Sequence, residues 1–502
     1  MEPEYILVKS KSHNDEAEMG EQQTILFQAD FNRAARVEPS PTPISEDAGA
    51  IALREVSEAL GLPALLAGIT DLRDPERITH PLQELLFSRI FLLAQGWQDQ
   101  DDADVLRPDP ALRLAVSSRA GDGPVRPPQK PRQPGGLASQ PTLSRLNHAL
   151  AHPDNIAVLQ DALLRCAINR IRRVHGRLAR LVVDIDSFPI EAHGNQPGSR
   201  YNGHYRRICT HPLIAFTDTG DIVGVLLRPG NVHTAADVQG FLEPIIAALR
   251  EVCDELLIRV DSGFAGASFF AYLANRGVKV ITRLPVNDRL RQKADDWATE
   301  VKAGWRSDAQ PDGRPREALL PFAHAATTWA AEKRVVAVVL ERNTRRSELL
   351  HNEFFIATDL GDELGPDAIL ALYRQRGTAE GHIGELKRVL APRLSSSARR
   401  PRRPPPDGEP PARPIGINDN AVVLLLSAIA YNLMHALRCG IEEAIGAGLS
   451  LDRLRERVLK TACVVVRHAR EVIFKVCPSK AAWWRAVSVA VHGLRQPCEV
   501  AA

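Results

Sequence analysis

LARLVVDIDSF, residues 178–188, is a run of β-branched and apolar residues that contains two aspartates. A short run of this kind predicts a buried strand. The next two apolar runs, HPLIAFTD (211–218) and DIVGVLLRPG (221–230), meet at the turn residues Asp218-Thr219-Gly220-Asp221. This arrangement predicts a hairpin directly after the first strand. Ionised carboxylates inside an apolar strand also need a partner or a metal, because their burial alone is costly.

The residues after the hairpin alternate between helical and strand-like patterns. They predict an amphipathic helix (234–254), a strand (255–261), a helix closed by glycine (267–277) and a strand (278–284). Three strands joined by hairpins, followed by parallel strands joined by helices, form the topology of an RNase H-like sheet. The sequence therefore predicts an α/β fold with an RNase H-like mixed sheet at its core.

Composition bounds the class of protein. The 502 residues are 44% hydrophobic and 25% charged with a net charge of +2, which is ordinary for a soluble multidomain protein. The seven cysteines are scattered without a C-x-x-C pair, so neither a disulfide framework nor a zinc site is expected. The apolar run 421–437 contains Asn432 and His435 and predicts a buried core helix instead of a membrane span. A cytoplasmic location is expected.

Three aspartates lie near the ends of predicted strands. Asp184 and Asp186 belong to the first strand, and Asp261 ends the first parallel strand. These two strands are neighbours in the predicted topology, so the carboxylates converge, and a divalent cation would relieve their repulsion. Each aspartate could instead cap the turn that follows it. Finding carboxylates at matching strand ends favours the metal site.

A predicted helix at 367–390 supplies a further acidic residue. Tyr373, Arg376, Glu380 and Lys387 fall on one face of this helix at a period of 3.6 residues. A solvated face with an Arg376–Glu380 ion pair would explain the same pattern if the helix stood alone.

The string YRQRGTAEGHIGELK (373–387) resembles the Y-x2-R-x3-E-x6-K signature of bacterial insertion-sequence transposases of the DDE type. All four signature positions match without a gap. VVDIDSF and RVDSGF resemble the first and second aspartate motifs of this family. The resemblance covers most of the chain.

This resemblance implies a two-metal site for DNA cleavage and strand transfer. Asp186, Asp261 and Glu380 would be the catalytic carboxylates and would hold two Mg²⁺ or Mn²⁺ ions. Tyr373, Arg376 and Lys387 would contact DNA phosphates near the transposon end. Pairing of two ends implies a homodimer in the DNA complex.

The first aspartate stays open between two residues. Asp184 and Asp186 share a face of the strand, because side chains alternate with period two. Relatives commonly carry Thr two positions after the catalytic aspartate, where this chain has Phe188. Asp186, at the strand end, is the preferred residue, with Asp184 as the alternative.

The pattern along the chain predicts seven segments. They are a disordered tail (1–46), a helical DNA-binding region (47–176), the first part of the catalytic core (177–284), a β-rich insertion (285–362), the core helix with the catalytic glutamate (363–395), a basic proline-rich loop (396–416) and a helical C-terminal region (417–502). Arginines 399, 400, 402, 403 and 413 suit a phosphate-binding arm or a solvated linker.

Two further groups are weaker candidates. His233 is either a ligand or part of a loop in which Thr234 caps the next helix. The acidic cluster of Asp99, Asp101, Asp102 and Asp104 is more typical of a hydrated loop than of a metal site.

The residues leave three functions in competition. The leading one is a transposase that binds terminal repeats and moves its element by cut-and-paste transfer of DNA. The others are a DNA-binding derivative that has lost its chemistry, and an RNase H-like metal-dependent nuclease.

Overall fold

The computed structural model describes residues 25–32, 34–117, 136–307, 316–343, 349–397, 416–468 and 471–496. The chain falls into two compact units, Met1–Pro43 and Ile44–Ala502. In the first unit, β1 (Phe27–Gln28) and β2 (Arg36–Val37) form an antiparallel pair. A short hairpin therefore lies within the segment that was expected to be a loose tail.

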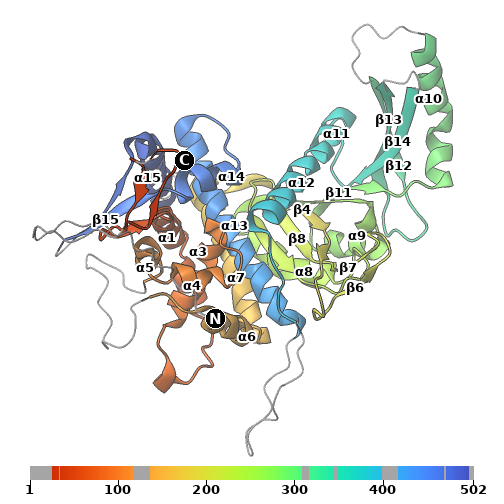
Figure 1. The fold of residues 1–502 in the computed structure, drawn as a ribbon. Helices are drawn as coiled ribbons and strands as arrows, with labels where there is room; N and C mark the ends of the chain where they lie inside the picture. Colours follow the sequence, from red (N-terminus) through yellow and green to blue (C-terminus); the bar gives the residue numbers. More distant parts are fainter. Residues whose placement is uncertain are drawn as a thin grey trace, which may run out of the picture. The chain divides into compact units, whose positions relative to one another are not determined.

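The second unit contains a mixed sheet of eight strands, ordered β12-β13-β14-β11-β10-β4-β8-β9 (Figure 1). Its central strands are β4 (Leu178–Ser187), β8 (Leu213–Thr217), β9 (Ile222–Leu226), β10 (Cys253–Val260) and β11 (Lys279–Leu284). The pairs β4–β8 and β8–β9 are antiparallel, whereas β4–β10 and β10–β11 are parallel. The predicted α/β fold with an RNase H-like mixed sheet is thus confirmed.

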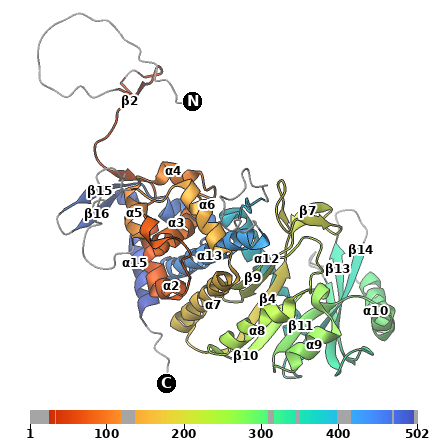
Figure 2. The same ribbon diagram turned by 90° about the horizontal axis from the view of Figure 1, so that it is seen from below.

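Helices cover both faces of this sheet. Val183 and Ile185 of β4 pack in the core shared with α8 (Val238–Leu249) and α9 (Ala267–Ala274). Val182 packs on the other face, in a core shared with α11 (Pro366–Arg374). Figure 1 shows α11 and α12 (Arg376–Glu385) in front of β4 and β8, and Figure 2 shows α8 and α9 beside the same sheet. Because side chains alternate along β4, Asp184 and Asp186 share the α11 face with Val182.

Residues 285–362 extend the sheet. β12 (Arg316–His324), β13 (Lys333–Asn343) and β14 (Leu349–Thr358) form an antiparallel ladder, and β14 pairs with β11. The segment begins with a helix, α10 (Asp288–Ser307), where polar, turn-rich sequence was expected. This helix was not predicted, because most of its residues are polar. Its apolar stripe is narrow and contains residues such as Leu290, Ala294 and Ala298.

Most of the remaining described elements are helical. The N-terminal part of the second unit contains α1 (Ala50–Ala59), α2 (Leu62–Leu66), η1 (Pro75–Arg77), α3 (Leu82–Gln95), α4 (Asp102–Leu106), α5 (Pro110–Val116), α6 (Gln140–Leu150) and α7 (Pro153–His175). The C-terminal part contains α13 (Ile417–Ile445), α14 (Leu451–Leu454), η4 (Arg455–Leu459), η5 (Pro478–Lys480) and α15 (Ala481–Arg495).

Two small sheets complete the second unit. One consists of β3 (Ile44–Ser45), β15 (Cys463–Arg467) and β16 (Val472–Val476). The other consists of β5 (Ile190–Glu191), β6 (Arg200–Asn202) and β7 (Arg207–Thr210), and it follows directly after β4. The second sheet was not predicted from the sequence, because its strands are only two to four residues long.

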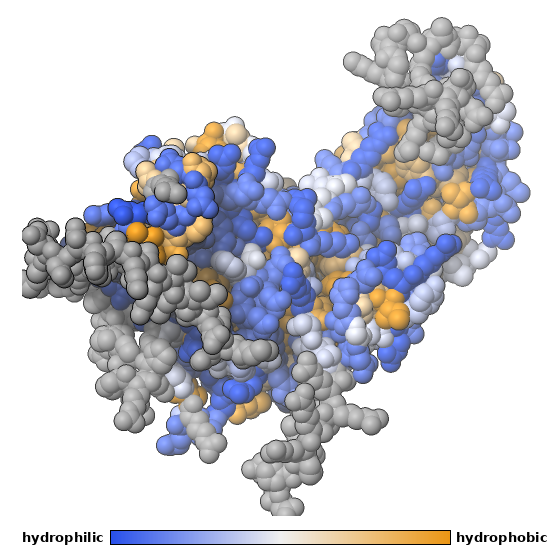
Figure 3. All heavy atoms as spheres, in the orientation of Figure 1, coloured by the Kyte–Doolittle hydropathy of each residue, from blue (hydrophilic) through white to orange (hydrophobic). Residues whose placement is uncertain are grey.

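Helix α13 is long and apolar enough to span a membrane, but 94% of its most apolar window is buried inside the protein. It packs against α7, α3 and α15, as a core helix does. The buried helix expected at 421–437 is therefore present. The face of the molecule in Figure 3 is largely hydrophilic, and its hydrophobic patches are scattered.

An ion pair fixes the β8–β9 hairpin to α7. Arg170 donates from Nε to Asp221 Oδ1 (2.5 Å) and from Nη2 to Asp221 Oδ2 (2.6 Å). The two side chains are only 2% and 1% exposed. Burial alone would raise the pKa of Asp221, but the Arg170 charge outweighs burial and holds that pKa below its usual value.

We predict that Asp221→Asn lowers the free energy of unfolding by about 3–5 kcal/mol, because it leaves the buried Arg170 charge unpaired. Asp161 provides the matched control: its ion pair with Arg165 is 61% and 36% exposed, so Asp161→Asn should cost about 0–1 kcal/mol. Urea titration of the three proteins measures both values. Equal, small losses in the two variants would contradict the prediction.

Candidate active site

Asp186 and Asp261 meet at one edge of the sheet. β4 and β10 are parallel neighbours in which Ile185 pairs with Val260, so the residues that follow them emerge side by side. Asp261 begins the turn η2 (Ser262–Phe264), and its Oδ1 accepts a hydrogen bond of 2.9 Å from the amide of Gly263. Asp186 Oδ1 accepts a hydrogen bond of 2.8 Å from the Ser187 amide.

The guanidinium of Arg376 connects Glu380 to this edge. Arg376 donates from Nη2 to Asp186 Oδ2 (2.6 Å) and from Nη1 to Glu380 Oε1 (2.5 Å). The side chain of Arg376 is 16% exposed, that of Asp186 21%, and that of Glu380 59%. The Arg376–Glu380 pair expected of a solvated helix face therefore exists, but its arginine also reaches a carboxylate on the sheet.

The charges of this group influence one another. Burial raises the pKa of Asp186; the Arg376 charge opposes this shift, and the nearby charges of Asp261 and Glu380 add to it. Burial alone would lower the pKa of Arg376, but the negative charge of Asp186 and its acidic neighbours holds that pKa above its usual value. The three predicted carboxylates thus lie within one electrostatic neighbourhood, with Arg376 as its central cation.

Asp184 has different surroundings. Arg259 donates to both of its carboxylate oxygens, Nε to Oδ1 (2.6 Å) and Nη2 to Oδ2 (2.7 Å), and the two side chains are 4% and 1% exposed. Arg259 also donates to the carbonyl of Leu372 in α11. Asp184 therefore joins β4 to β10 and α11, and Asp186 is the aspartate of β4 that reaches the exposed edge.

The other signature residues face the same edge. Burial raises the pKa of Tyr373. The charges of Arg376 and Arg283 oppose this shift, and those of Asp261 and Glu380 add to it. Burial lowers the pKa of Lys387, whereas the Asp186 charge raises it, and Lys387 Nζ lies 4.7 Å from the centre of the Phe188 ring.

The helix expected at 367–390 is not continuous. It is interrupted at Gln375 between α11 and α12, and it ends in a π-helical turn, η3 (Leu386–Leu390). A π-helical turn shifts the following residues around the helix axis, which is common at functional sites. A uniform period of 3.6 residues therefore does not describe the path from Glu380 to Lys387, although both side chains lie near Asp186.

One further side chain near this edge, Tyr205, was not predicted from the sequence. Tyr205 lies in the turn between β6 and β7, and its ring packs against those of His204 and His211. Its pKa is raised by burial and then by the charges of Asp186 and Asp261. The only signal in the sequence was the concentration of aromatic and basic residues in RYNGHYRR (200–207).

The weaker candidates have local roles in the described chain. His233 Nδ1 accepts from the Ala235 amide (3.2 Å). The next helix, α8, begins at Val238 after Asp237, so the expected capping role of Thr234 is wrong. Thr234 lies instead beside the Asp261–Gly263 turn, where its methyl carbon is 3.3 Å from the position of a Cβ on Gly263.

The acidic cluster at 99–104 has protein partners. Asp99 pairs with Arg393 (3.1 Å), Asp102 accepts from the Asp99 amide (3.2 Å), and Asp104 accepts from the Gln140 amide (3.0 Å). The basic residues 399–413 lie outside the described residues.

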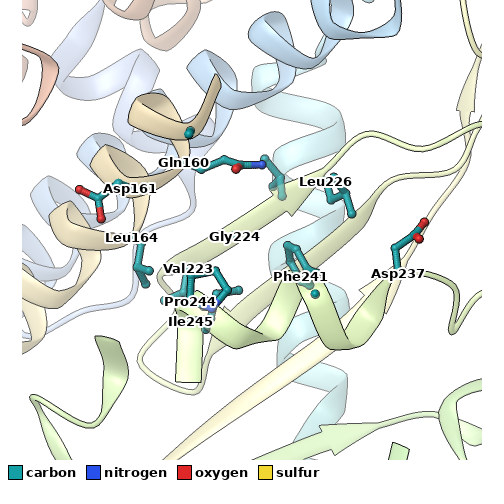
Figure 4. Close-up of a pocket in the computed structure, with 13 residues that line it drawn as sticks. Gln160, Asp161, Leu164, Val223, Gly224, Leu226, Asp237, Phe241, Pro244 and Ile245 are labelled. Atoms are coloured by element: carbon teal, nitrogen blue, oxygen red, sulfur yellow. The ribbon is translucent and has the colours of Figure 1, made fainter. Parts of the chain in front are cut away.

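Two grooves lie on opposite faces of the sheet. The first, of about 560 Å³, is an apolar groove between α7, β9 and α8, lined by residues such as Leu164, Val223 and Phe241 (Figure 4). None of the three predicted carboxylates lines it. The second, of about 760 Å³, begins at Phe188 and Lys387 and is lined further on by His193 and Arg393. The second groove begins beside Asp186, and a smaller pocket of about 240 Å³ is lined by Ser262 and Gly263, directly after Asp261.

The donor chemistry of the three carboxylates fits a divalent metal such as Mg²⁺, which prefers oxygen ligands. In the described part of the chain, no three acidic, histidine or cysteine residues lie in an arrangement that would hold a metal. Arg376 occupies the space between Asp186 and Glu380 and supplies the positive charge there. The carboxylates therefore have the oxygen donors that such a metal needs, while Arg376 neutralises two of them in this arrangement.

We predict that Asp184→Asn costs more stability than Asp186→Asn. Asp184→Asn leaves the buried Arg259 charge without its partner and should cost about 3 kcal/mol or more. Asp186→Asn should cost about 1 kcal/mol or less, because Arg376 keeps its ion pair with the exposed Glu380. Urea titration at neutral pH measures the difference, and a large loss in Asp186→Asn would contradict it.

Comparison with known proteins places this arrangement in a family. A comparison with curated sequences gives no match. The solved cryo-EM structure of the piggyBac transposase synaptic complex with hairpin DNA is similar to this chain with a TM-score of 0.38 and 10% identity, over 84% of this chain and 82% of that chain. The family model described as transposase DDE domain group 1 matches residues 27–402, which is more than half of the chain and includes Asp186, Asp261 and Glu380. The chain therefore belongs to the DDE transposase family.

Proposed function

We propose that this protein is an active transposase that binds the terminal repeats of an insertion sequence, cuts the DNA at the element ends and joins them to a target. The observation that carries the proposal is the Arg376 guanidinium shared between Asp186 and Glu380, with Asp261 on the adjacent strand. Acidic side chains from three separate elements gather around one cation at a sheet edge. Asp184 already makes a buried ion pair that ties β4 to its neighbours, so this second, more exposed cluster suggests a role beyond support.

Asp186, Asp261 and Glu380 are the catalytic residues in this proposal and would hold two Mg²⁺ or Mn²⁺ ions. Bound metal supplies Lewis acidity and an activated oxygen nucleophile for in-line attack on a phosphodiester. The parallel pairing of β4 and β10 holds Asp186 and Asp261 side by side, and these carboxylates determine where the reaction takes place. Arg376 compensates their charge before DNA binds and becomes free to contact a phosphate when Glu380 moves away.

Tyr373, Arg376 and Lys387 are the proposed DNA contacts. Lys387 is exposed at the edge beside Asp186, so its ammonium is available to a DNA phosphate. The groove of about 760 Å³ that starts at Lys387 gives a DNA strand a path away from the carboxylates. Arg393 and His193 line that path, and both suit a phosphate backbone.

The remaining parts of the proposal concern assembly. The helices between residues 47 and 176 are the proposed reader of the terminal repeats, and two protein copies would bring two ends together as a homodimer in the DNA complex. The protein would act on DNA in the cytoplasm, on the nucleoid.

We predict that purified protein with Mg²⁺ cuts DNA carrying the terminal repeats of its own element at the ends and joins them to a target. Glu380→Gln should reduce cleavage roughly a thousandfold or more, because it removes a metal ligand worth several kcal/mol at the transition state. End binding should persist, since Glu380 is negative and repels phosphate. Single-turnover cleavage and a gel-shift titration measure the two properties.

The control variant is Asp367→Asn, which changes an exposed carboxylate in the first turn of α11, outside the proposed carboxylate set. It should cut at a rate near that of the wild-type protein. Cutting without preference for the repeats would favour a nuclease, and binding without cutting would favour a derivative that has lost its chemistry. Unimpaired cleavage by Glu380→Gln would exclude the proposed carboxylate set.

A further inference from the structure

The turn between β6 and β7 is built around a buried asparagine. Asn202 is 8% exposed, and its Oδ1 accepts from the amides of His204 (3.0 Å) and Tyr205 (3.2 Å). Its Nδ2 donates to the carbonyl of Gly230 (2.7 Å). A Cβ on Gly230 would lie 1.9 Å from the Cys209 carbonyl oxygen, so only glycine permits this close approach. The turn is therefore held in one position relative to the loop at 229–232.

The same turn is fixed against the end of β4. The rings of Tyr205 and His211 are 5.6 Å apart at an interplanar angle of 70°, and His204 packs on the other side of Tyr205 at 4.8 Å. His211 directly precedes Pro212, whose carbonyl accepts from the Phe188 amide (3.3 Å). Phe188 is two residues beyond Asp186, so the packing of His211 brings Tyr205 to the carboxylate edge.

Strand pairing places Tyr205 near the end of β4, because Ser187 pairs with Leu213, two residues after the His211 that contacts Tyr205. The charges of Asp186 and Asp261 add to the effect of burial in raising the pKa of Tyr205. The hydrogen bonds to Asp186 come from Ser187 and Arg376.

A second, independent observation comes from His211. This side chain is 3% exposed, and its Nε2 has no hydrogen-bond partner among the described residues, whereas its Nδ1 lies 3.3 Å from the Val232 carbonyl. A buried polar atom without a partner is costly, and such atoms in native proteins are usually satisfied by water or ligand. The unsatisfied atom belongs to the ring that packs edge-on against Tyr205.

We propose that Tyr205 is a substrate-contacting residue whose hydroxyl donates a hydrogen bond to a non-bridging oxygen of the scissile phosphate, held in place by the Asn202 turn and His211. This inference rests on the proposed function and adds a donor that lies outside the four-residue signature. Asp186, Asp261 and Glu380 approach the phosphate from the sheet and α12, and Tyr205 approaches it from the separate β5–β7 sheet. The exposed Arg206 lies next to Tyr205 in the turn and would contact a neighbouring phosphate.

The test is single-turnover cleavage of a terminal-repeat DNA by the wild-type protein, Tyr205→Phe and Tyr201→Phe. Loss of a hydrogen bond to a charged phosphate should slow Tyr205→Phe roughly 10- to 100-fold, with end binding unchanged. Tyr201 is the matched control because it lies on the same hairpin and its side chain is 62% exposed. Tyr201→Phe should cut at the wild-type rate.

A phosphorothioate at the scissile position separates contact from structural support. Sulfur accepts hydrogen bonds poorly, so the diastereomer that replaces the contacted oxygen should slow the wild-type protein. The same substitution should slow Tyr205→Phe less, because the hydrogen bond is already absent. Fully additive effects for both diastereomers, or wild-type cutting by Tyr205→Phe, would overturn the inference alone. A wild-type protein that does not cut the ends at all would overturn the proposed function and this inference with it.

Discussion

The structure depends on the rule that a carboxylate removed from water requires a cation. Three aspartates of the central sheet obey it, each with an arginine from a different element: Asp221 with Arg170 of α7, Asp184 with Arg259 of β10, and Asp186 with Arg376 of α12. Each pair joins two elements that are distant in sequence. The first two pairs are almost fully buried and act as fixed connections, whereas the third lies at the edge and is only partly buried.

This gradient of burial separates two fixed ion pairs from one that is open to solvent. Arg259 makes two hydrogen bonds to Asp184 and one to the backbone of α11, so it has little freedom to change partners. Arg376 divides its hydrogen bonds between a half-buried aspartate and an exposed glutamate. An ion pair with one exposed member costs little to open, because water replaces the lost contact. The same residue type therefore makes a fixed connection at one position and a more open one, shared between two carboxylates, at the other.

The path of the helix after Tyr373 shows how local irregularity serves this site. The break at Gln375 and the π-helical turn at Leu386–Leu390 lie on either side of Glu380. Between them, α12 presents Arg376 and Glu380 to β4, and the π-helical turn brings Lys387 beside Phe188. In a regular helix each residue is rotated by the same angle about the helix axis, and the prediction of a single face for Tyr373, Arg376, Glu380 and Lys387 rests on that constant angle.

The sequence by itself determined the order of the central strands and helices, because β-branched runs, the Asp218–Asp221 turn and amphipathic periodicity are local signals. It also singled out Asp186, Asp261 and Glu380, because the motifs that contain them can be recognised from residue spacing alone. Their roles stay predictions. Only the tertiary structure distinguished the surroundings of Asp184 and Asp186, because both lie on one face of one strand and differ in what packs over them. The same holds for α10, whose apolar stripe is narrow, and for Tyr205. The strands β5, β6 and β7 around Tyr205 are only two to four residues long and show no periodicity. The position of Tyr205 near the carboxylates depends on contacts between segments that are distant in sequence.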